Sequence, residues 1–340
     1  MSCDTDGSQP VSDGWHFVAW SFFTGQIPQL TALSCDHQLA AMRAKIPALL
    51  NRRTFSQVSY PTVLCRDLLM SLFSGCGQIV DRHLGITDQW RREAPRYRHE
   101  PSLLRMTEEN LPDGEALVSD LFGQMMRNWG AAGCPATTSH QNWRFNKHVD
   151  FQDKPRPPKV PLERTISSLT GNNWANQIPV DSGLICDGAK TLDLATINGN
   201  VAELIELKVD SNTPLSAAIQ ILLYGLANVF FQINKQRVLP DGSASKLLEV
   251  KELRLRVLAP KTYYERFSKV ELWLKSFESC LDQGVKTFFN KFVNPDYVKI
   301  SQFCFQVFPA SFGWDQTRHA DLTHRDEVLN AIQNRTRYFA

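Results

Sequence analysis

The sequence lacks the paired cysteines and closely spaced histidines from which many metal centres are built. Its eight cysteines are scattered, and no two of them form a CxxC pair. A zinc ribbon or a cysteine-bound iron–sulfur cluster is therefore not indicated, and reduced thiols of a cytoplasmic protein are the plain interpretation. The eight histidines form no HExxH motif, so a histidine-based metal site is not expected either.

A charge excess, an export signal and a nucleotide-binding loop are also missing. Lys and Arg number 37 against 35 Asp and Glu, so any surface that binds nucleic acid must be a local patch. The polar start of the chain lacks the basic-then-apolar order of a signal peptide, and we expect no long uncharged apolar run and no membrane span. The absence of a Walker-type lysine loop argues against an ATP motor. We expect a globular cytoplasmic protein that contacts no membrane.

The residues around an Asn-Gly pair at 198–199 predict a β-hairpin. The runs on both sides of this pair are rich in β-branched and aliphatic residues, and Asn-Gly is a strong hairpin signal. With a two- or four-residue loop centred on the pair, Asp193 lies opposite Leu204. Because side chains alternate between the two faces of a strand, Asp193, Glu206 and Lys208 then share one face. An odd-length loop or a bulge would send Asp193 to the other face.

Two carboxylates and a lysine on an apolar face are costly to bury unless they are paired or bind a cation. Hard cations such as Mg²⁺ take oxygen ligands from one or two carboxylates and leave further positions to water and phosphate. Asp193 and Glu206 are therefore candidate ligands of Mg²⁺ or Mn²⁺, and such an ion would activate water and offset charge on a phosphate. Lys208 would position or activate that water. A surface ion pair is the common alternative for an acidic-x-lysine strand.

Asp193 followed by Glu206-Leu207-Lys208 resembles the bipartite signature of the PD-(D/E)xK phosphodiesterase superfamily, which includes restriction-type and RecB-type nucleases. The PD dipeptide itself is absent, because Leu192 precedes the aspartate. The resemblance covers roughly the C-terminal half of the chain.

The helix predicted after the hairpin adds to this resemblance. Thr213 is a candidate N-cap, and Pro214 at the first helical position opens an apolar helix to about Phe231. Gln220 and Tyr224 are four residues apart on one face of that helix. The pair is similar to the Gln-x3-Tyr motif of the RecB-type branch, which implies that it lies beside the active site. Polar groups on a packed helix are the alternative interpretation.

The resemblance implies an α/β fold with a restriction-endonuclease-like core, in which a central mixed β-sheet is flanked by helices. The predicted order of hairpin, helix, strand, helix and strand agrees with this core, with the last three at Leu253–Leu258, Tyr263–Lys291 and Ile300–Phe308. The superfamily also has an acidic residue on a helix before the hairpin, for which Glu163 is the candidate. By resemblance, the backbone carbonyl of Leu207 is a further metal ligand.

Composition divides the chain near residue 155. Residues 153–161 are proline-rich and charged, which favours an extended connector. We place a mainly α-helical N-terminal region at 1–155, with a role in substrate selection, and the nuclease-like domain at 156–340. Helical spacing of apolar residues predicts helices at His37–Asn51, Pro61–Leu84 and Gly114–Trp129, and a strand is expected at Ile178–Cys186.

The N-terminal region also carries arginines interleaved with aromatic residues. Arg91, Arg92, Arg96 and Arg98 follow Trp90, a combination that suits phosphate contact and base stacking. A solvated loop is the commoner source of such runs. These residues are the candidate nucleic-acid-binding segment.

The sequence thus predicts a nuclease that hydrolyses phosphodiester bonds in nucleic acid with Mg²⁺ or Mn²⁺, and the resemblance favours DNA as the substrate. A catalytically inactive nucleic-acid-binding or assembly module on the same fold is the alternative. Both are compatible with a homodimer or with a partner protein of a larger system.

Overall fold

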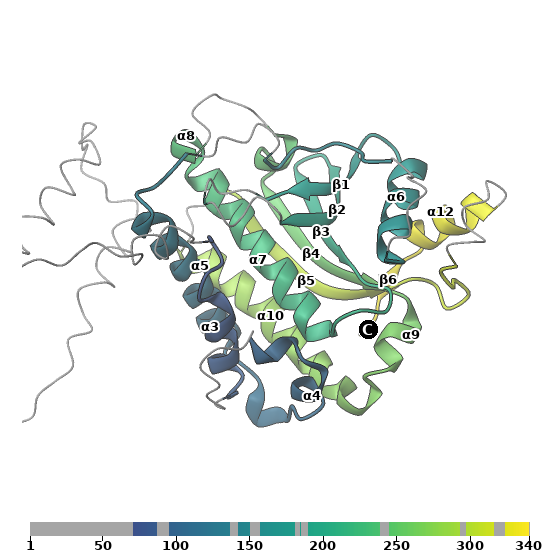
Figure 1. Ribbon diagram of the computed structural model, residues 1–340, viewed down its shortest axis with the longest axis horizontal. Helices are drawn as coiled ribbons and strands as arrows, with labels where there is room; N and C mark the ends of the chain where they lie inside the picture. Colours follow the sequence, from purple (N-terminus) through teal and green to yellow (C-terminus); the bar gives the residue numbers. More distant parts are fainter. Residues whose placement is uncertain are drawn as a thin grey trace, which may run out of the picture. The chain divides into compact units, whose positions relative to one another are not determined.

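A six-stranded mixed β-sheet forms the centre of the described part of the protein (Figure 1). The computed structural model describes residues 71–86, 95–136, 142–149, 157–180, 184, 190–238, 245–292, 297–315 and 324–339. β1 to β3 pair antiparallel, β3 to β5 pair parallel, and β6 is antiparallel to β5. The strands lie in chain order as β1 (Trp174–Pro179), β2 (Thr191–Asn198), β3 (Val201–Leu207), β4 (Glu252–Ala259), β5 (Lys299–Val307) and β6 (Thr336–Arg337).

Helices cover both faces of this sheet, which confirms the expected α/β class. The helix Pro214–Ile233, which follows the hairpin, packs on β3, β4 and β5. The helices Lys159–Leu169 and Arg325–Gln333 pack together on the opposite face. The helices of the described residues are α3 (Cys76–His83), α4 (Glu100–Leu103), α5 (Gly114–Ala131), α6 (Lys159–Leu169), α7 (Pro214–Ile233), α8 (Lys235–Val238), α9 (Lys261–Glu265), α10 (Glu271–Phe292) and α12 (Arg325–Gln333). Shorter 3-10 turns are η1 (Arg96–Arg98), η2 (Glu108–Asn110), η3 (Lys246–Leu248) and η4 (Ser268–Val270).

The predicted hairpin is present as β2 and β3, but its register differs from the expected one by two residues. Asn198 pairs with Val201, so Gly199 and Asn200 form the loop instead of the Asn-Gly pair. Gly199 has φ of +59°, a left-handed value that glycine adopts without steric cost. One step beyond the Leu194–Ile205 pair, Asp193 lies opposite Glu206 rather than Leu204. Because the shift is an even number, the predicted sharing of one face is preserved.

Two expectations about the chain before the hairpin are wrong. The preceding strand is β1, which ends at Pro179, where the Ile178–Cys186 strand was expected. Residues 159–161, expected in an extended connector, already belong to α6. Pro161 lies in the first turn of α6, where its missing N–H removes no intrahelical hydrogen bond.

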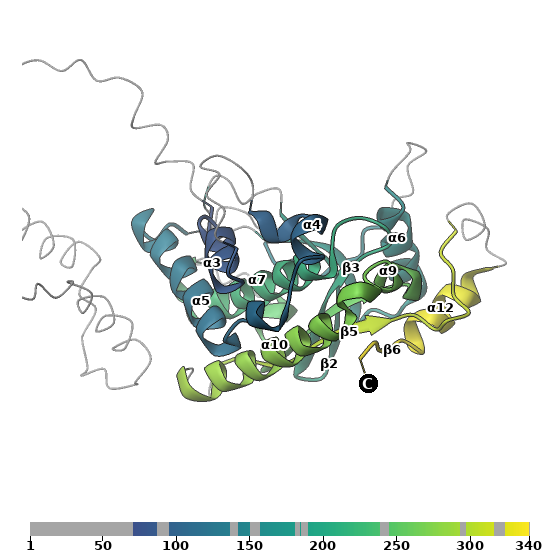
Figure 2. The ribbon, with the colours of Figure 1, turned by 90° about the horizontal axis from the view of Figure 1, so that it is seen from below.

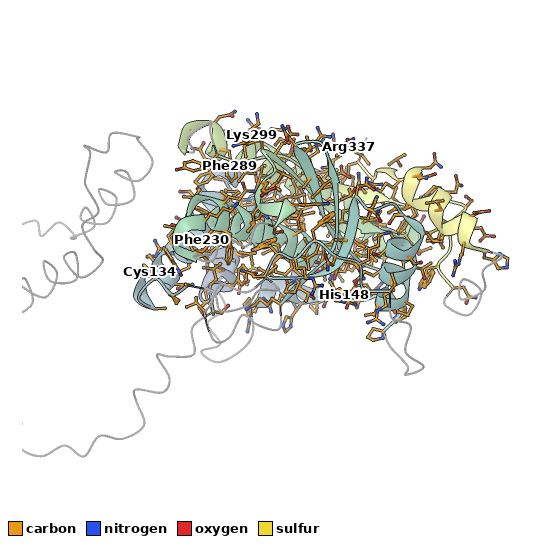
Figure 3. All side chains as sticks on the ribbon, turned by 90° about the horizontal axis from the view of Figure 1, so that it is seen from above. Cys134, His148, Phe230, Phe289, Lys299 and Arg337 are labelled. Atoms are coloured by element: carbon orange, nitrogen blue, oxygen red, sulfur yellow. The ribbon has the colours of Figure 1, made fainter. Side chains whose placement is uncertain are left out.

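Helix α7 is the interior helix of the fold and begins as predicted. Thr213 accepts a hydrogen bond from the backbone N–H of Ser216, and Pro214 is the first helical residue. The helix has no charged residue and a mean hydropathy of 1.6, so it is long and apolar enough to cross a membrane. The expectation that no such run exists is wrong. However, 94% of that stretch is buried inside the protein, as expected for a core helix. Phe230, labelled in Figure 3, is one of its fully buried residues.

The segment after β4 is broken, where one helix from Tyr263 to Lys291 was expected. It forms α9, then η4, then α10, because buried side chains fix the turn. The hydroxyl of Tyr264 donates to the backbone oxygens of Val257 and Gln306, which anchors α9 to β4 and β5. Helix α10 then runs along β5.

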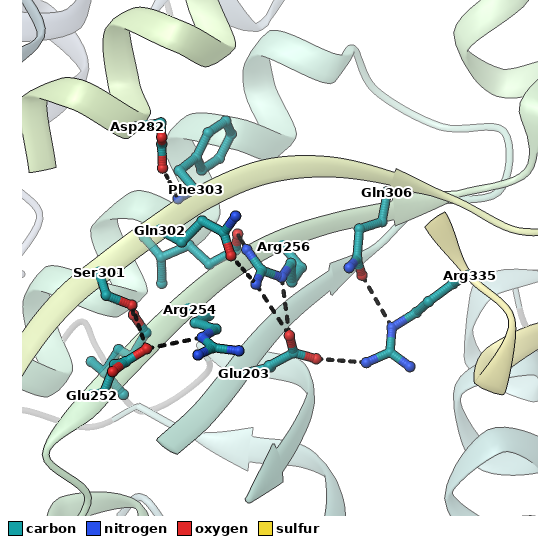
Figure 4. A network of polar contacts seen from close by, with 12 residues as sticks. Glu203, Glu252, Arg254, Arg256, Asp282, Ser301, Gln302, Phe303, Gln306 and Arg335 are labelled. Carbon is teal, nitrogen blue, oxygen red and sulfur yellow. Dashed lines mark hydrogen bonds and ion pairs between the residues drawn. The ribbon is translucent and has the colours of Figure 1, made fainter. Parts of the chain in front are cut away.

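Two carboxylates of α10 accept hydrogen bonds from backbone N–H groups of β5. Glu278 Oε2 accepts from the N–H of Phe305 at 2.6 Å. Asp282 Oδ1 accepts from the N–H of Phe303 at 2.9 Å, as Figure 4 shows. These bonds occupy backbone N–H groups of β5 before its short pairing with β6, so that they are not available to another strand.

The sheet face opposite α7 is divided into an apolar and a polar half. The apolar half packs under α6 and α12 around Ile205 and Leu258. In the polar half, Glu203 accepts hydrogen bonds from Arg256 and Arg335 (Figure 4). Burial opposes the charge of Glu203, but the two arginines outweigh burial and lower its pKa. Glu203 and Glu206 lie on opposite faces of the sheet, as expected from the alternation of side chains along β3.

Helices before residue 155 pack on helices that follow it (Figures 1 and 2). α5 confirms the helix expected at Gly114–Trp129 and contacts α7 and α10. The helix expected at Pro61–Leu84 lies only partly within the described residues. There α3 begins at Cys76, after Gly75, whose φ of +78° is left-handed, so the helix is shorter than expected. The His37–Asn51 helix lies outside the described residues. All described residues belong to one compact unit, 68–340, and the boundary at 155 stays a prediction.

Candidate active site

Asp193 on β2 and Glu206 on β3 are both buried, with side chains 5% and 0% exposed. Asp193 Oδ2 accepts a hydrogen bond from the backbone N–H of Leu207 at 2.8 Å, which ties the aspartate to the neighbouring strand. Glu206 Oε1 accepts from Lys208 Nζ at 2.8 Å. Glu206 Oε2 is buried and has no hydrogen-bond partner among the described residues.

Lys208 follows the last residue of β3 and continues its pairing, with its N–H bonded to the oxygen of Leu258 at 2.9 Å. Its side chain is only 3% exposed. The pair of Lys208 and Glu206 is therefore a buried ion pair, and the alternative of a surface ion pair does not apply to it. A buried ion pair is weak evidence for stability, because desolvation offsets much of the attraction. The buried pair is therefore a better candidate for a part in chemistry than for a part in stabilising the core.

Lys159 is a second lysine of this site, which sequence reasoning missed. It lies on the first turn of α6, and its Nζ is 2.7 Å from Asp193 Oδ1 and 4.0 Å from Glu206 Oε1. Burial opposes the charge of Lys159, but Asp193 and Glu206 outweigh burial and raise its pKa. The spacing of Lys159 and Glu163, one helical turn apart, was the available signal.

Glu163 lies on a helix before the hairpin, where the resemblance placed an acidic residue. Its side chain is buried, and its Oε1 accepts from Asn176 Nδ2 at 3.1 Å. Asn176 in turn exchanges two hydrogen bonds with the backbone of His148. Glu163 is close enough to Asp193 for the two charges to interact.

Burial and mutual repulsion make these carboxyl groups weak acids. Burial first, and then the charge of Asp193, raise the pKa of Glu206 to about 8, although Lys208 and Lys159 act against the shift. Burial and Asp193 likewise raise the pKa of Glu163 to about 8, against its hydrogen bond from Asn176. The fold thus holds protons that an unfolded chain would release near pH 4.5.

This predicts that the metal-free protein loses stability as the pH rises from about 4.5 to about 8, because the folded state binds more protons in that window. Glu163→Gln keeps an oxygen for Asn176 but no longer titrates. We expect the variant to remove up to about 1.4 kcal/mol per pH unit from the slope of the unfolding free energy. Urea unfolding at several pH values, with chelator present, measures this slope. Glu265→Gln, at an exposed glutamate, is the control. An unchanged slope in Glu163→Gln would contradict the raised pKa.

Gln220 and Tyr224 lie on α7 with the predicted spacing, and the structure brings Tyr224 to the carboxylates. The Tyr224 hydroxyl is hydrogen-bonded to Gln220, and burial first, then Glu206, raise its pKa. Tyr263, which sequence reasoning did not single out, has a buried hydroxyl with no partner among the described residues. Burial raises its pKa, and the charge of Glu206 adds to the shift. Both phenols therefore remain hydrogen-bond donors at neutral pH.

The structure describes part of the predicted nucleic-acid-binding segment, which packs on α7, the helix that carries Tyr224. The side chain of Arg98, exposed on η1, lies over the Tyr97 ring, and its charge acts weakly against the raised pKa of Tyr224. The backbone N–H groups of Arg96 and Tyr97 donate to the carboxylate of Asp81, which fixes the turn against α3. Trp90, Arg91 and Arg92 lie outside the described residues.

The oxygen donors of the site suit a hard cation, although some of them bind side chains of the protein instead. Asp193 and Glu206 offer carboxylate oxygens, and the Glu206 Oε2 atom is without a partner among the described residues. Across the described part of the chain, no three His, Cys, Asp or Glu side chains are grouped so that they could hold a metal ion. Asp193 and Glu163 are instead turned to Lys159 and Asn176. A metal ion at this site would therefore depend on two carboxylates, those of Asp193 and Glu206.

Comparison with known proteins adds no assignment. No protein-family model, no curated protein and no solved structure matches this chain.

Proposed function

We propose that this protein is a metal-dependent nuclease with its active centre at Asp193, Glu206 and Lys208. The observation that carries the proposal is the Glu206 Oε2 atom, a buried carboxylate oxygen without a hydrogen-bond partner among the described residues. Such an oxygen is costly in a folded protein unless a cation or a water completes it. It belongs to the same side chain that the acidic-x-lysine pattern marks as a ligand.

Asp193 and Glu206 would hold Mg²⁺ or Mn²⁺, and the carbonyl of Leu207 and the carboxylate of Glu163 are proposed as further ligands. When bound, the ion would acidify a water molecule and offset negative charge on the scissile phosphate. The Leu207 N–H bond to Asp193 Oδ2 keeps the aspartate on the glutamate side of the hairpin. The two candidate ligands are therefore positioned by backbone pairing rather than by loops.

Lys208 would orient the attacking water and stabilise charge that develops at the phosphate. Its ammonium group is held by Glu206 and is almost fully removed from solvent. A positive charge fixed in a buried site acts more strongly on a transition state than one in water. The hydroxyls of Tyr224 and Tyr263 would supply hydrogen-bond donors beside it.

The proposed substrate is nucleic acid, with DNA favoured by the resemblance. Arg98 supports this assignment, because its exposed guanidinium is near enough to Tyr224 for its charge to act on the phenol. The order of hairpin, helix, strand, helix and strand also agrees with the restriction-endonuclease-like core that we propose for this sheet. A cytoplasmic location, and action as a homodimer or with a protein partner, are part of the same proposal.

The test is degradation of mixed single- and double-stranded DNA and RNA with Mg²⁺, with Mn²⁺ and with chelator. We expect cleavage only with a divalent cation, and none by an Asp193→Asn variant purified in the same way. Cleavage that persists in Asp193→Asn would point to a contaminant or to another site. Binding without cleavage under every condition would favour the inactive nucleic-acid-binding module.

Arg98 offers a separate test of substrate contact. If Arg98 meets a phosphate, Arg98→Gln should lower nucleic-acid affinity and reduce the slope of log affinity against log salt by about 0.7 to 0.9. Fluorescence anisotropy at several salt concentrations measures both quantities. Arg254→Gln removes an equally charged side chain from the sheet face opposite α7 and should change neither. Equal slopes for Arg98→Gln and the parent would assign Arg98 to a solvated turn.

A further inference from the structure

A lysine of the chain lies where a cation is expected between the two carboxylates. Lys159 Nζ is 2.7 Å from Asp193 Oδ1 and 4.0 Å from Glu206 Oε1. It also lies near enough to Glu163 for the two charges to interact. Because Lys208 already binds Glu206 Oε1, Lys159 mainly compensates the aspartate.

The compensation by these two lysines is incomplete. Three carboxyl groups, those of Glu163, Asp193 and Glu206, interact in one buried region. Glu206 Oε2 and the Tyr263 hydroxyl are buried there without partners among the described residues. The site therefore keeps unused oxygen atoms although two ammonium groups are present. Oxygen atoms in excess of the internal cations are what a divalent cation would need.

The two lysines differ in their access to solvent. The Lys208 side chain is 3% exposed, whereas the Lys159 side chain is 26% exposed at the start of α6. Lys159 can thus exchange its carboxylate for water by rotating its side chain, and Lys208 has no such route. Long lysine side chains readily keep the aliphatic part packed while the ammonium group reaches water.

We propose that the Lys159 ammonium group is a built-in cation that holds Asp193 in the metal-free protein and must leave it before a divalent cation binds. This inference rests on the proposed function, since it concerns the same site. Occupancy then becomes a competition between Lys159 and the metal. The apparent metal affinity equals the intrinsic affinity multiplied by the fraction of molecules in which Asp193 is not held by the lysine. A cell's divalent cation concentration would thereby decide whether the site is loaded.

Calorimetric titration with Mn²⁺ tests the competition directly. Lys159→Met keeps the length of the side chain and removes its charge, so we expect Mn²⁺ to bind about tenfold more tightly or better than to the parent. Lys291→Met removes an exposed lysine that pairs with Glu115, and it should bind Mn²⁺ as the parent does. Equal or weaker binding by Lys159→Met would overturn the proposal.

A second measurement uses the parent protein and needs no variant to fold. Reductive methylation of lysines, followed by mass spectrometry, reports how accessible each amine is. We expect Lys159 to be methylated several-fold faster with saturating Mg²⁺ than with chelator, while Lys291 keeps its rate. A Lys159 rate that does not rise with Mg²⁺ would overturn the displacement.

These measurements distinguish failure of the competition between Lys159 and the metal from failure of the nuclease proposal. Tighter Mn²⁺ binding by Lys159→Met, without any cleavage of nucleic acid, would support the competition and reject the nuclease. Metal-dependent cleavage together with unchanged affinity in Lys159→Met would do the reverse. If neither the parent nor Lys159→Met bound Mn²⁺, both would be rejected.

Discussion

Lys208→Met is expected to lower the rate of nucleic-acid cleavage by about 100-fold or more while nucleic-acid affinity changes little. A positioned proton-transfer group commonly contributes a factor of this size, and removing a group that acts only in the transition state lowers kcat rather than raising KM. Methionine is preferred to alanine because it fills most of the space of the buried lysine. Single-turnover cleavage at saturating Mg²⁺ measures the rate, and anisotropy measures the affinity.

The control for this variant is its fold. Lys208 is buried against Glu206, and loss of one partner of a buried ion pair can cost about 3 to 5 kcal/mol. Burial and Asp193 raise the pKa of Glu206 to about 8 even with Lys208 present, so the carboxyl group is largely protonated at pH 7 and loss of the lysine leaves no unpaired charge on it. Thermal unfolding at pH 7 should therefore show a folded variant. A folded Lys208→Met protein with the turnover of the parent would remove Lys208 from the catalytic assignment.

Gly284→Ala is expected to destabilise the protein by about 3 kcal/mol, at the upper end of the cost of overpacking. A Cβ atom at this position of α10 would lie 2.3 Å from the carbonyl carbon of Gly114 and 2.5 Å from its oxygen. Both are backbone atoms at the start of α5, so the two helices would have to separate. Chemical unfolding, followed by tryptophan fluorescence, measures the change.

Gly130→Ala provides the matched control, because Gly130 is also helical and a Cβ there would meet nothing within 4 Å. It should be neutral or stabilise the protein by up to about 1 kcal/mol. If Gly284→Ala unfolded at the same denaturant concentration as the parent, the close approach of α5 and α10 would be wrong. The result also bears on the predicted boundary at residue 155, since the two helices lie on either side of it.

The local elements of the site could be predicted from the amino-acid sequence alone. An Asn-Gly pair between two β-branched runs was sufficient for the hairpin, and Thr213 with Pro214 was sufficient for the start of α7. The common face of Asp193, Glu206 and Lys208 followed from alternation along a strand, which depends only on whether the register shift is odd or even. These features could be predicted because turns, caps and strand alternation are set by residues close in sequence.

The loop position and the other partners of the site were decided by tertiary structure. The hairpin loop lies at Gly199 and Asn200 rather than being centred on Asn198 and Gly199. The left-handed conformation thus falls on the glycine, and β2 keeps its pairing with β1. Lys159 reaches Asp193 only because α6 packs on β1 and β2, and no local pattern relates residues 34 positions apart. Tyr263 approaches Glu206 because the chain turns at α9.

The charge state of the site was also beyond the sequence. Glu206 and Glu163 are ordinary acids in an unfolded chain, and only burial beside Asp193 raises the pKa of each to about 8. Desolvation and carboxylate repulsion depend on which groups the fold excludes from water together. The sequence therefore determined which residues are available for chemistry. The packing of α6, α7 and α9 around one hairpin decided which of them meet.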